Sequence, residues 1–393
     1  MQPTARVIAN ALRLMPVVGP TYNRLRLTHA HRMTGRELSD EDLRRLRTRS
    51  QCLVSPAVSA LESVTCVVGV QAQDSTAAAL NIRARSGCPD ATAIDTMIGT
   101  SRSIVRTWAM RGTLHTLAAG DVRWLVMLLG PRFTAKYRSA RLALGLTDHL
   151  LERAVDALPE VLRSSAPITR AALVQRLGEA GINIGPQGQA PAHLVVAASL
   201  RGILCCGPDA PNGKSTYVLL DEWIPRQKSR PKDPLGELAK RYLAGHGPAS
   251  VRDFAAWSGL PAAEARDAIE RVAADFEEAQ VHGERVWFRT TTGSDARVVR
   301  LVGGFDSYLL AYRQREFAVD QRHSARVQPG GGIIRPLVLV DGRIEGAWRL
   351  RDGRVVIDVF GNQRNALEQE VREVERFLSG TSSRKALSTT TSA

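Results

Sequence analysis

The sequence has no apolar run approaching the roughly 18 residues that a membrane-spanning helix needs, which argues against a transmembrane segment. Its five cysteines form no Cys-x-x-Cys pair and no regular spacing, and no secretory signature precedes them. Its eight histidines are scattered without a His-Glu-x-x-His motif or another metal-ligand pattern. These absences predict reduced thiols, a cytoplasmic location, no metal and no cofactor.

Lysine is also scarce, since only 6 of the 53 basic residues are lysine. The excess of arginine reflects genomic base composition, or the suitability of arginine for bidentate contacts to phosphates and bases. The formal net charge of +14 favours a polyanionic partner, nucleic acid first, over a merely basic cytoplasmic protein. The chain has 393 residues, of which 44% are hydrophobic and 23% charged, and this predicts a globular protein of two or three domains.

The two ends of the chain differ from the rest in composition. Residues 1–36 contain six arginines and no acidic residue, so we interpret them as a flexible basic extension. A weak transit peptide, or upstream sequence included by a start codon before Met33, would give the same composition. Residues 381–393 are of low complexity and are predicted to form a disordered tail.

Residues 37–145 are predicted to form a first winged-helix-like unit. A helix is expected after Ser39, because Asp42 follows three residues later as in a capping box. Two short helices are expected at 56–66 and 90–100, and a pair of strands at 104–117. A long helix capped by Asp121 is expected to follow.

Two further segments repeat the order helix, helix, helix, hairpin, which is the order of a winged helix. The second unit covers 146–228, where Asn-Gly at 212–213 lies between two alternating runs and predicts a hairpin. The third unit covers 229–296. There Ser-Gly followed by Leu-Pro at 258–261 fits the corner of a helix-turn-helix.

From residue 297 the pattern changes to alternation of apolar and polar residues, with Asp-Gly turns at 341–342 and 352–353. We interpret 297–380 as an antiparallel β module closed by a final helix. The predicted fold class is therefore α+β, with tandem winged-helix units and a C-terminal antiparallel β module.

Two glutamines, Gln71 and Gln73, flank one small apolar residue in the segment Val-Gln-Ala-Gln-Asp. In extended backbone the period of two places both side chains on the same face. Each amide carries a donor and an acceptor, so two convergent amides can hold one water between them and direct its lone pair at one point. A protein core has little use for such a pair, because buried amides must be satisfied. A loop that caps its own backbone is the alternative interpretation.

Four blocks in order, together with this glutamine pair, resemble the bacterial winged-helix DNA glycosylases that unhook bulky alkylated guanines and interstrand crosslinks. The best-known branch of that superfamily confers azinomycin resistance and has Gln-apolar-Gln as its signature. The resemblance runs from about Leu38 to about Gly380. The blocks are those at 105–117, 247–260, 303–315 and 336–360.

The resemblance implies a monofunctional glycosylase that hydrolyses the N-glycosidic bond of bulky N7-alkylguanine adducts, with interstrand crosslinks as further substrates to consider. Such a base already carries positive charge, so catalysis needs a placed water and a stabilised oxocarbenium-like sugar more than a strong general acid. Gln71 and Gln73 would place that water. Because the catalytic segment contains no lysine, no Schiff-base lyase step is expected.

The resemblance also implies a partner and a role. The partner would be double-stranded DNA with an alkylated guanine, bound by a monomer located at the nucleoid, with no membrane involved. The role would be base-excision DNA repair or self-resistance to a genotoxic antibiotic. One branch of the superfamily has an acidic residue where this chain has Gln73, so this chain is placed with the bulky-adduct branch.

Three residues beside the glutamine pair have two interpretations each. Asp74 is a helper carboxylate or the N-cap of the following helix. Arg111 precedes a glycine, so it either contacts a DNA phosphate that the backbone can approach or forms a structural salt bridge. His115 follows a strand-like segment and either contacts the lesion or the DNA phosphate, or is a satisfied structural histidine.

The C-terminal part of the chain supplies further candidates. Asp306 either lines the cleft or fixes the β module to the third unit. Arg313 and Arg315 alternate to one face and either follow a phosphate backbone or are solvated. Arg322 and His323 lie in a basic segment that also includes Arg326, expected as a loop or hairpin whose tip contacts DNA.

Two other functions are compatible with the same segments. A non-enzymatic transcriptional regulator would use its winged helices to read the major groove, and the two glutamines would be incidental. A catalytically silent relative would bind adducts tightly and release no base.

Overall fold

The computed structural model describes most of the chain between Gly35 and Ser379, and these residues belong to one compact unit. The described ranges are 35–163, 166–185, 188–225, 230–290, 296–361 and 367–379. Apart from residues 35 and 36, the predicted basic extension lies outside them, as does the predicted tail. Within these ranges no helix is long and apolar enough to cross a membrane.

A six-stranded antiparallel sheet forms the centre of this unit, with the strand order β1-β3-β2-β5-β6-β4. The strands are β1 (Val70–Gln71), β2 (Ile104–Trp108), β3 (Leu114–Ala118), β4 (Ile168–Thr169), β5 (Leu204–Cys206) and β6 (Thr216–Leu219). The expected strand pair over 104–117 and the hairpin around 212–213 are both confirmed. Because β2 pairs with β5 at Arg106 and Cys206, the sheet crosses the predicted boundary at 145–146.

The N-terminal helices follow the local signals of the sequence in most places. The helix α1 (Asp40–Ser50) begins with the expected capping box, in which Ser39 and Asp42 each bond the backbone of the other. The next three helices are α2 (Ala60–Cys66), α3 (Ser75–Arg83) and α4 (Ala91–Gly99). The strand-to-helix step from β1 into α3 is the one that positions the glutamine pair.

The long helix α5 (Ala119–Lys136) corrects one prediction, because Asp121 does not cap it. The helix starts two residues earlier, and its N-cap Ala118 has no side-chain hydrogen bond. The carboxylate of Asp121 instead accepts from Trp124 Nε1 at 2.9 Å and from Arg241 Nη1 at 2.5 Å. A carboxylate in the first helical turn thus serves tertiary contacts.

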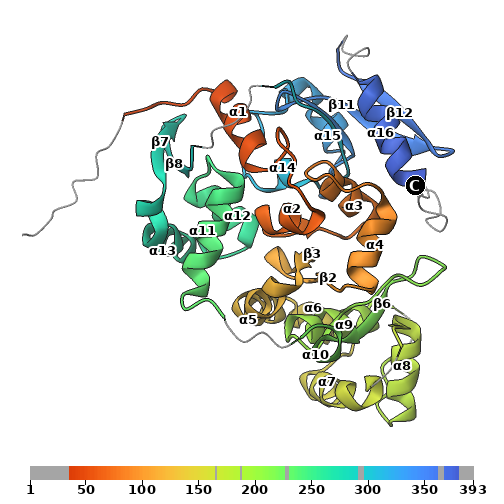
Figure 1. Cartoon of the computed structure of the whole chain (residues 1–393). Coiled ribbons are helices and arrows are strands. Elements are labelled where there is room, and N and C mark those ends of the chain that lie inside the picture. The colour runs from red at the N-terminus through yellow and green to blue at the C-terminus, as the bar shows by residue number, and fades with distance from the viewer. Residues whose placement is uncertain are drawn as a thin grey trace, which may run out of the picture. The chain divides into compact units, whose positions relative to one another are not determined.

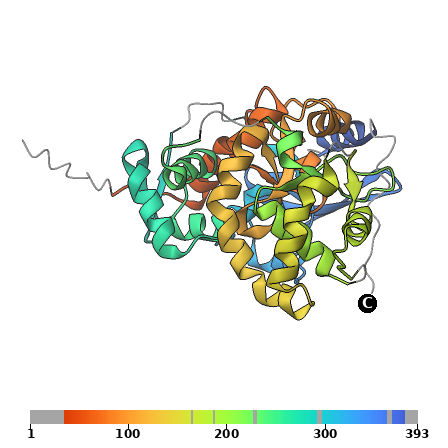
Figure 2. The ribbon, with the colours of Figure 1, turned by 90° about the horizontal axis from the view of Figure 1, so that it is seen from below.

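The segment after α5 supplies helices that cover the sheet. They are α6 (Arg138–Ala143), α7 (Asp148–Leu162), α8 (Arg170–Glu179), α9 (Ala190–Leu200) and the short α10 (Leu220–Trp223). In Figure 2 the orange-yellow, yellow and light-green helices of this segment lie side by side, in agreement with the packing of α5 and α7 against α9. The apolar residues of α7, α8 and α9 form a core with β5 and β6.

The third segment has three helices followed by a hairpin, as the sequence predicts. The elements are α11 (Pro234–His246), α12 (Val251–Ser258), α13 (Ala262–Val272), β7 (Glu277–Val281) and β8 (Glu284–Phe288). Figure 1 shows these green-to-teal elements grouped together. Gly259 ends α12 with a left-handed φ of 80° at the predicted corner.

The C-terminal segment forms a four-stranded antiparallel sheet in the order β12-β11-β10-β9, which confirms the predicted β module. Its strands are β9 (Val299–Val302), β10 (Leu337–Val340), β11 (Arg343–Arg351) and β12 (Arg354–Val359), and its helices are α14 (Ser307–Leu310), α15 (Ser324–Val327) and α16 (Glu368–Ser379). Both Asp-Gly turns have positive φ at each central residue, as two-residue hairpins require.

Candidate active site around Gln71 and Gln73

The glutamine pair lies where the edge strand β1 turns into helix α3. Gln71 is paired with His115 of β3, and the amide of Ala72 donates to the carbonyl of Leu114 at 2.8 Å. Two residues later Asp74 caps α3 by accepting from the amide of Ala77 at 2.9 Å. The cap interpretation of Asp74 therefore describes its contact, and the second glutamine lies just beyond the end of β1, before α3 begins.

The two amides meet directly. Gln71 Nε2 donates to Gln73 Oε1 at 2.7 Å, so both side chains point to the same side as the spacing predicts. No room for a bridging water remains along this bond, which differs from the expected arrangement with a water between the amides. Gln71 is buried and Gln73 is exposed, so the pair links the interior to the surface.

Arg111 completes this group from the connection between β2 and β3. Its Nη2 donates to Gln71 Oε1 at 2.6 Å, and its Nη1 donates to the carbonyl oxygen of Trp257, near the end of α12, at 2.6 Å. Among the described residues no carboxylate pairs with this guanidinium. The structural salt bridge, one of its two interpretations, is therefore not seen, and the guanidinium bonds a glutamine of the pair instead.

Burial lowers the pKa of Arg111 to about 10, and the positive charge of Arg315 contributes in the same direction. At neutral pH the guanidinium still carries its proton and its charge. A half-buried cation without a carboxylate is costly unless its hydrogen bonds are satisfied, and here two neutral oxygens satisfy them.

His115 lies on the same face as Gln71 but is 2% exposed. Its Nδ1 lies 2.9 Å from the carbonyl oxygen of Thr113, so the neutral tautomer that donates from Nδ1 satisfies the bond. Burial, followed by the charge of Arg111, lowers the pKa of His115 to about 3. Of its two interpretations, the contacts favour the satisfied structural histidine.

Comparison with known proteins identifies the family of the chain. The family model described as DNA glycosylase AlkZ-like matches residues 64–377. The chain belongs to the AlkZ-like family of DNA glycosylases. It is 28% identical over 340 residues to an interstrand DNA cross-link repair glycosylase of Streptomyces sahachiroi, covering 81% of this chain and 90% of the relative.

A solved structure, the DNA glycosylase AlkZ of Streptomyces sahachiroi, is similar in fold as well. Its TM-score is 0.73 at 26% identity, and the match covers 89% of this chain and 99% of that chain. The chain is thus a DNA glycosylase, and its substrate is DNA. The interpretation as a non-enzymatic regulator is set aside.

The structure places Asp306 outside the glutamine site. Its carboxylate, 1% exposed, accepts from both terminal nitrogens of Arg85 at 2.7 and 2.8 Å and caps α14 through the amide of Tyr308. Arg85 follows α3 and also donates to Gln51. Asp306 therefore does not line a cleft, and it fixes the C-terminal segment to the first segment instead of the third.

Arg313 and Arg315 do not share an environment, although the sequence predicts one face for both. Arg313 is exposed, and its side chain forms no ion pair with another described residue. Arg315 is half-buried and donates to the carbonyl of Leu309 at 3.0 Å and to Gln328 Oε1 at 2.5 Å. Burial lowers the pKa of Arg315, and its charge acts on Arg111.

The basic segment around Arg322 is not a loop or hairpin, because it forms a 3-10 turn over Gln321–His323 and then α15. Arg322 pairs with Asp320 at 2.7 Å, and the His323 ring stacks on Phe360 at 4.4 Å between centroids. Both candidates therefore have partners within the chain.

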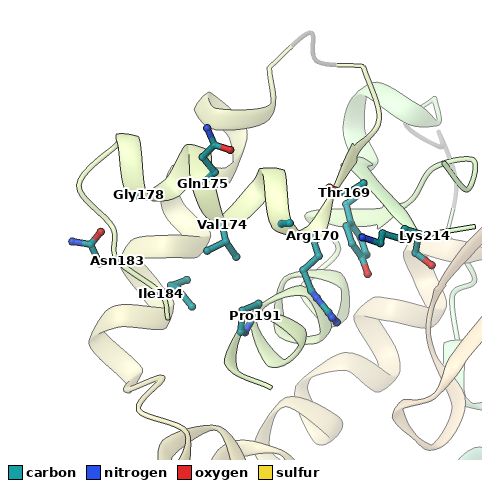
Figure 3. A pocket seen from close by; sticks show the side chains of 12 residues that line it. Thr169, Arg170, Val174, Gln175, Gly178, Asn183, Ile184, Pro191 and Lys214 are labelled. Carbon is teal, nitrogen blue, oxygen red and sulfur yellow. The ribbon is translucent and has the colours of Figure 1, made fainter. Parts of the chain in front are cut away.

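A cavity of about 650 Å³ lies between α8, α9 and β6, and none of the predicted site residues lines it. Figure 3 shows Arg170, Lys214 and Pro191 around it. Within the described residues no three His, Cys, Asp or Glu side chains gather as a metal site would require.

The contact between Arg111 and Gln71 is the feature that sequence reasoning missed. Both residues were candidates, but they are 40 positions apart, Gln71 on β1 and Arg111 in the connection between β2 and β3. The only local signal is the glycine after Arg111, which permits the tight connection that brings the guanidinium back to β1.

Proposed function

We propose that this chain is a monofunctional DNA glycosylase that removes bulky N7-alkylguanine, using a water positioned by Gln71 and Gln73. The observation that supports it best is the bonded pair of neutral amides at the end of β1, with a cationic donor on one side and an exposed carboxamide on the other. The relative named for cross-link repair supports interstrand crosslinks as a further substrate.

The chemistry suits neutral groups. In the reaction the oxygen of water bonds to C1′ of the sugar while the bond from C1′ to N9 of the base breaks. The electron pair of that bond goes to the alkylated guanine and cancels its positive charge, and one proton of the water is released to solvent. Amides can hold the water without a charge that must first be desolvated, and without trapping the cationic sugar as an ion pair.

Two of the four carbonyl lone pairs of the glutamine pair are available for this water. Gln71 Oε1 accepts once from Arg111, and Gln73 Oε1 accepts once from Gln71. A carbonyl oxygen has two acceptor positions, so each keeps one. We propose that the water donates to these remaining lone pairs, at the exposed side of the bonded pair.

The contacts to DNA are proposed to come from winged-helix units and from free arginines. The segment from α11 to β8 has the element order of a winged helix, and α7 to β6 shows the same order. The net charge of +14 and the exposed Arg313 favour attraction to a phosphate backbone. We propose one monomer on a duplex, without a Schiff-base step, since no lysine bonds either glutamine among the described residues.

The test is base release from a duplex that carries N7-methylguanine, a bulky N7-alkylguanine or an N7-linked crosslink. We expect the wild type to release the bulky base and to leave an intact abasic strand. Gln71→Ala and Gln73→Ala should each lower the single-turnover rate by about 100-fold. The matched control is Gln369→Ala on α16, an exposed glutamine that donates to Glu373 one turn along the helix.

Each outcome has a distinct meaning. Release that survives both site substitutions would keep the enzyme class and reject the two glutamines as water-positioning residues. Release of every adduct except bulky ones would reject the proposed substrate. Strand cleavage, or trapping of the enzyme on DNA by borohydride, would reject the monofunctional mechanism.

A further inference from the structure

The hydrogen bonds of Arg111, Gln71 and Gln73 form a chain with one direction. A guanidinium donates hydrogen bonds and accepts none, so the atom of Gln71 at 2.6 Å from Arg111 Nη2 has to be the carbonyl oxygen. The amide nitrogen of Gln71 then faces Gln73 and donates to its oxygen at 2.7 Å. Arg111 therefore determines the orientation of both amides, which otherwise could rotate by half a turn.

The backbone is built to deliver Arg111 to this position. Its φ is +58°, a left-handed conformation that is rare for residues other than glycine and that recurs at functional sites. The corner between α12 and α13 also comes close, because a Cβ on Gly259 would lie 3.1 Å from Arg111 Cα. This approach brings the carbonyl of Trp257 within 2.6 Å of Arg111 Nη1, which holds the guanidinium from a second side.

From this geometry we propose that Arg111 is a positioning residue for the glycosylase reaction, which orients the two glutamines, instead of a contact to the DNA phosphate. The proposal rests on the function proposed above for Gln71 and Gln73. The charged donor fixes which lone pairs face the exposed side. It also polarises the amide of Gln71, because hydrogen bonds in a chain strengthen one another.

The direction of the chain makes the two glutamines unequal. Position 71 must accept from Arg111 and also donate to position 73, which only an amide can do. Position 73 must accept from Gln71 and keep a lone pair for water, which a carboxylate can do as well. A glutamate should therefore be tolerated at position 73 and not at position 71.

The experiment compares single-turnover base release at saturating enzyme with the salt dependence of duplex binding. Arg111→Met removes the donors while keeping an unbranched chain, and we expect a rate about 30-fold to 100-fold lower. The slope of log affinity against log salt should stay at the wild-type value. Loss of a phosphate contact would instead reduce that slope by about 0.9 and leave the saturated rate unchanged, which would overturn the proposal.

Two further variants distinguish a positioning role of Arg111 from a general loss of folding: a lysine at position 111, and Arg111→Met combined with Gln71→Ala. Arg111→Lys keeps a charged donor for Gln71 and should recover at least tenfold of the rate lost in Arg111→Met. In a Gln71→Ala background, Arg111→Met should cost less than threefold, because the chain is already broken. Full additivity of the two losses, or no recovery with lysine, would reject a positioning role.

The glutamate variants test the direction of the hydrogen-bond chain while Arg111 stays unchanged. Gln73→Glu should keep the saturated rate within about tenfold of the wild type, whereas Gln71→Glu should lose about 100-fold. The opposite order would overturn the assigned direction. The matched control is Arg372→Gln on α16, an exposed arginine that pairs with Glu368 outside the proposed DNA-contacting units, which should leave rate and slope unchanged.

The failures of the two proposals can be told apart. If Gln71→Ala and Gln73→Ala retain activity, the proposed function of the glutamines fails, and the positioning role of Arg111 fails with it. If both glutamine variants are inactive while Arg111→Met is fully active, only the positioning role fails.

Discussion

Arg85 and Asp306 form a doubly bonded ion pair in which both side chains are at most 1% exposed. The pair joins Arg85, two residues beyond the end of α3, to Asp306, the residue before α14, and the two are 221 positions apart in the chain. Because α3 begins directly after the glutamine pair, this contact holds the first and last segments of the unit in place around the candidate active site.

Substitution of Asp306 should therefore act on stability. Asp306→Ala leaves the Arg85 charge buried without its carboxylate, which costs about 3–5 kcal/mol of unfolding free energy. Urea denaturation of the purified variant measures this loss. As a control, Glu368→Ala removes an exposed partner of Arg372 and should change stability little. A stable Asp306→Ala enzyme with impaired base release would mean that Asp306 acts in the cleft after all.

Much of the fold could be predicted from local signals. Ser39 and Asp42 predict the start of the first helix, and the Asp-Gly pairs predict the hairpins of the C-terminal sheet. Caps and turns can be predicted in this way because they depend on a few neighbouring residues. Asp121 was misassigned because its partners Trp124 and Arg241 come from packing, which overrides the preference of a carboxylate for a cap.

The sequence could predict which residues form the candidate site, but not which of them bond one another. The spacing of Gln71 and Gln73 showed that their amides would converge. The spacing of apolar and polar residues could not show that the Arg111 side chain contacts Gln71. That contact depends on the left-handed backbone at Arg111 and on the register of β1 with β3. The exposed state of Arg313 and the internal pair of Arg322 likewise depend on tertiary neighbours.

The buried histidines should make stability depend on pH. The folded pKa of His115 is about 3, below its usual value near 6.5, so between these values the unfolded chain binds more protons. Stability from this group is complete above pH 6.5 and is lost as the pH falls. Each such histidine contributes a slope of about 1.4 kcal/mol per pH unit in the middle of that window.

His115→Gln tests this because a neutral amide replaces the titrating ring. Its unfolding free energy should fall less steeply between pH 6 and pH 4 than that of the wild type, by about 1.4 kcal/mol per unit. His246, also buried with a pKa of about 3, keeps its own contribution in both proteins. Equal slopes for the variant and the wild type would contradict the buried neutral state. The exposed His149 provides the control substitution.

The thiols of Cys52 and Cys66 lie 3.0 Å apart, and this contact should make one of them reactive. The hydrogen-bonding contact with Cys66 lowers the pKa of Cys52 to about 7, whereas burial raises the pKa of Cys88. Because thiolates are the nucleophiles, iodoacetamide at pH 7 should label Cys52 several-fold faster than Cys88. Peptide mass spectrometry after short labelling identifies the site. Preferential labelling of Cys88, or unchanged total labelling in Cys52→Ser, would disprove this order.

The arginines predicted to contact DNA should differ in their effect on the salt dependence of binding, according to whether they already pair with a carboxylate in the chain. Arg313 is exposed and has no ion pair among the described residues, whereas Arg322 already pairs with Asp320. A free guanidinium that neutralises one phosphate adds about 0.9 to the slope of log affinity against log salt. Arg313→Gln should therefore reduce that slope by about this amount. Arg322→Gln should change it less, because Asp320 already compensates the charge of Arg322 within the chain. Binding of an undamaged duplex, titrated from 50 to 200 mM salt by fluorescence anisotropy, measures both slopes under the same conditions. Equal reductions in the two variants would mean that the internal pair with Asp320 opens when DNA binds, and would return Arg322 to the contact surface.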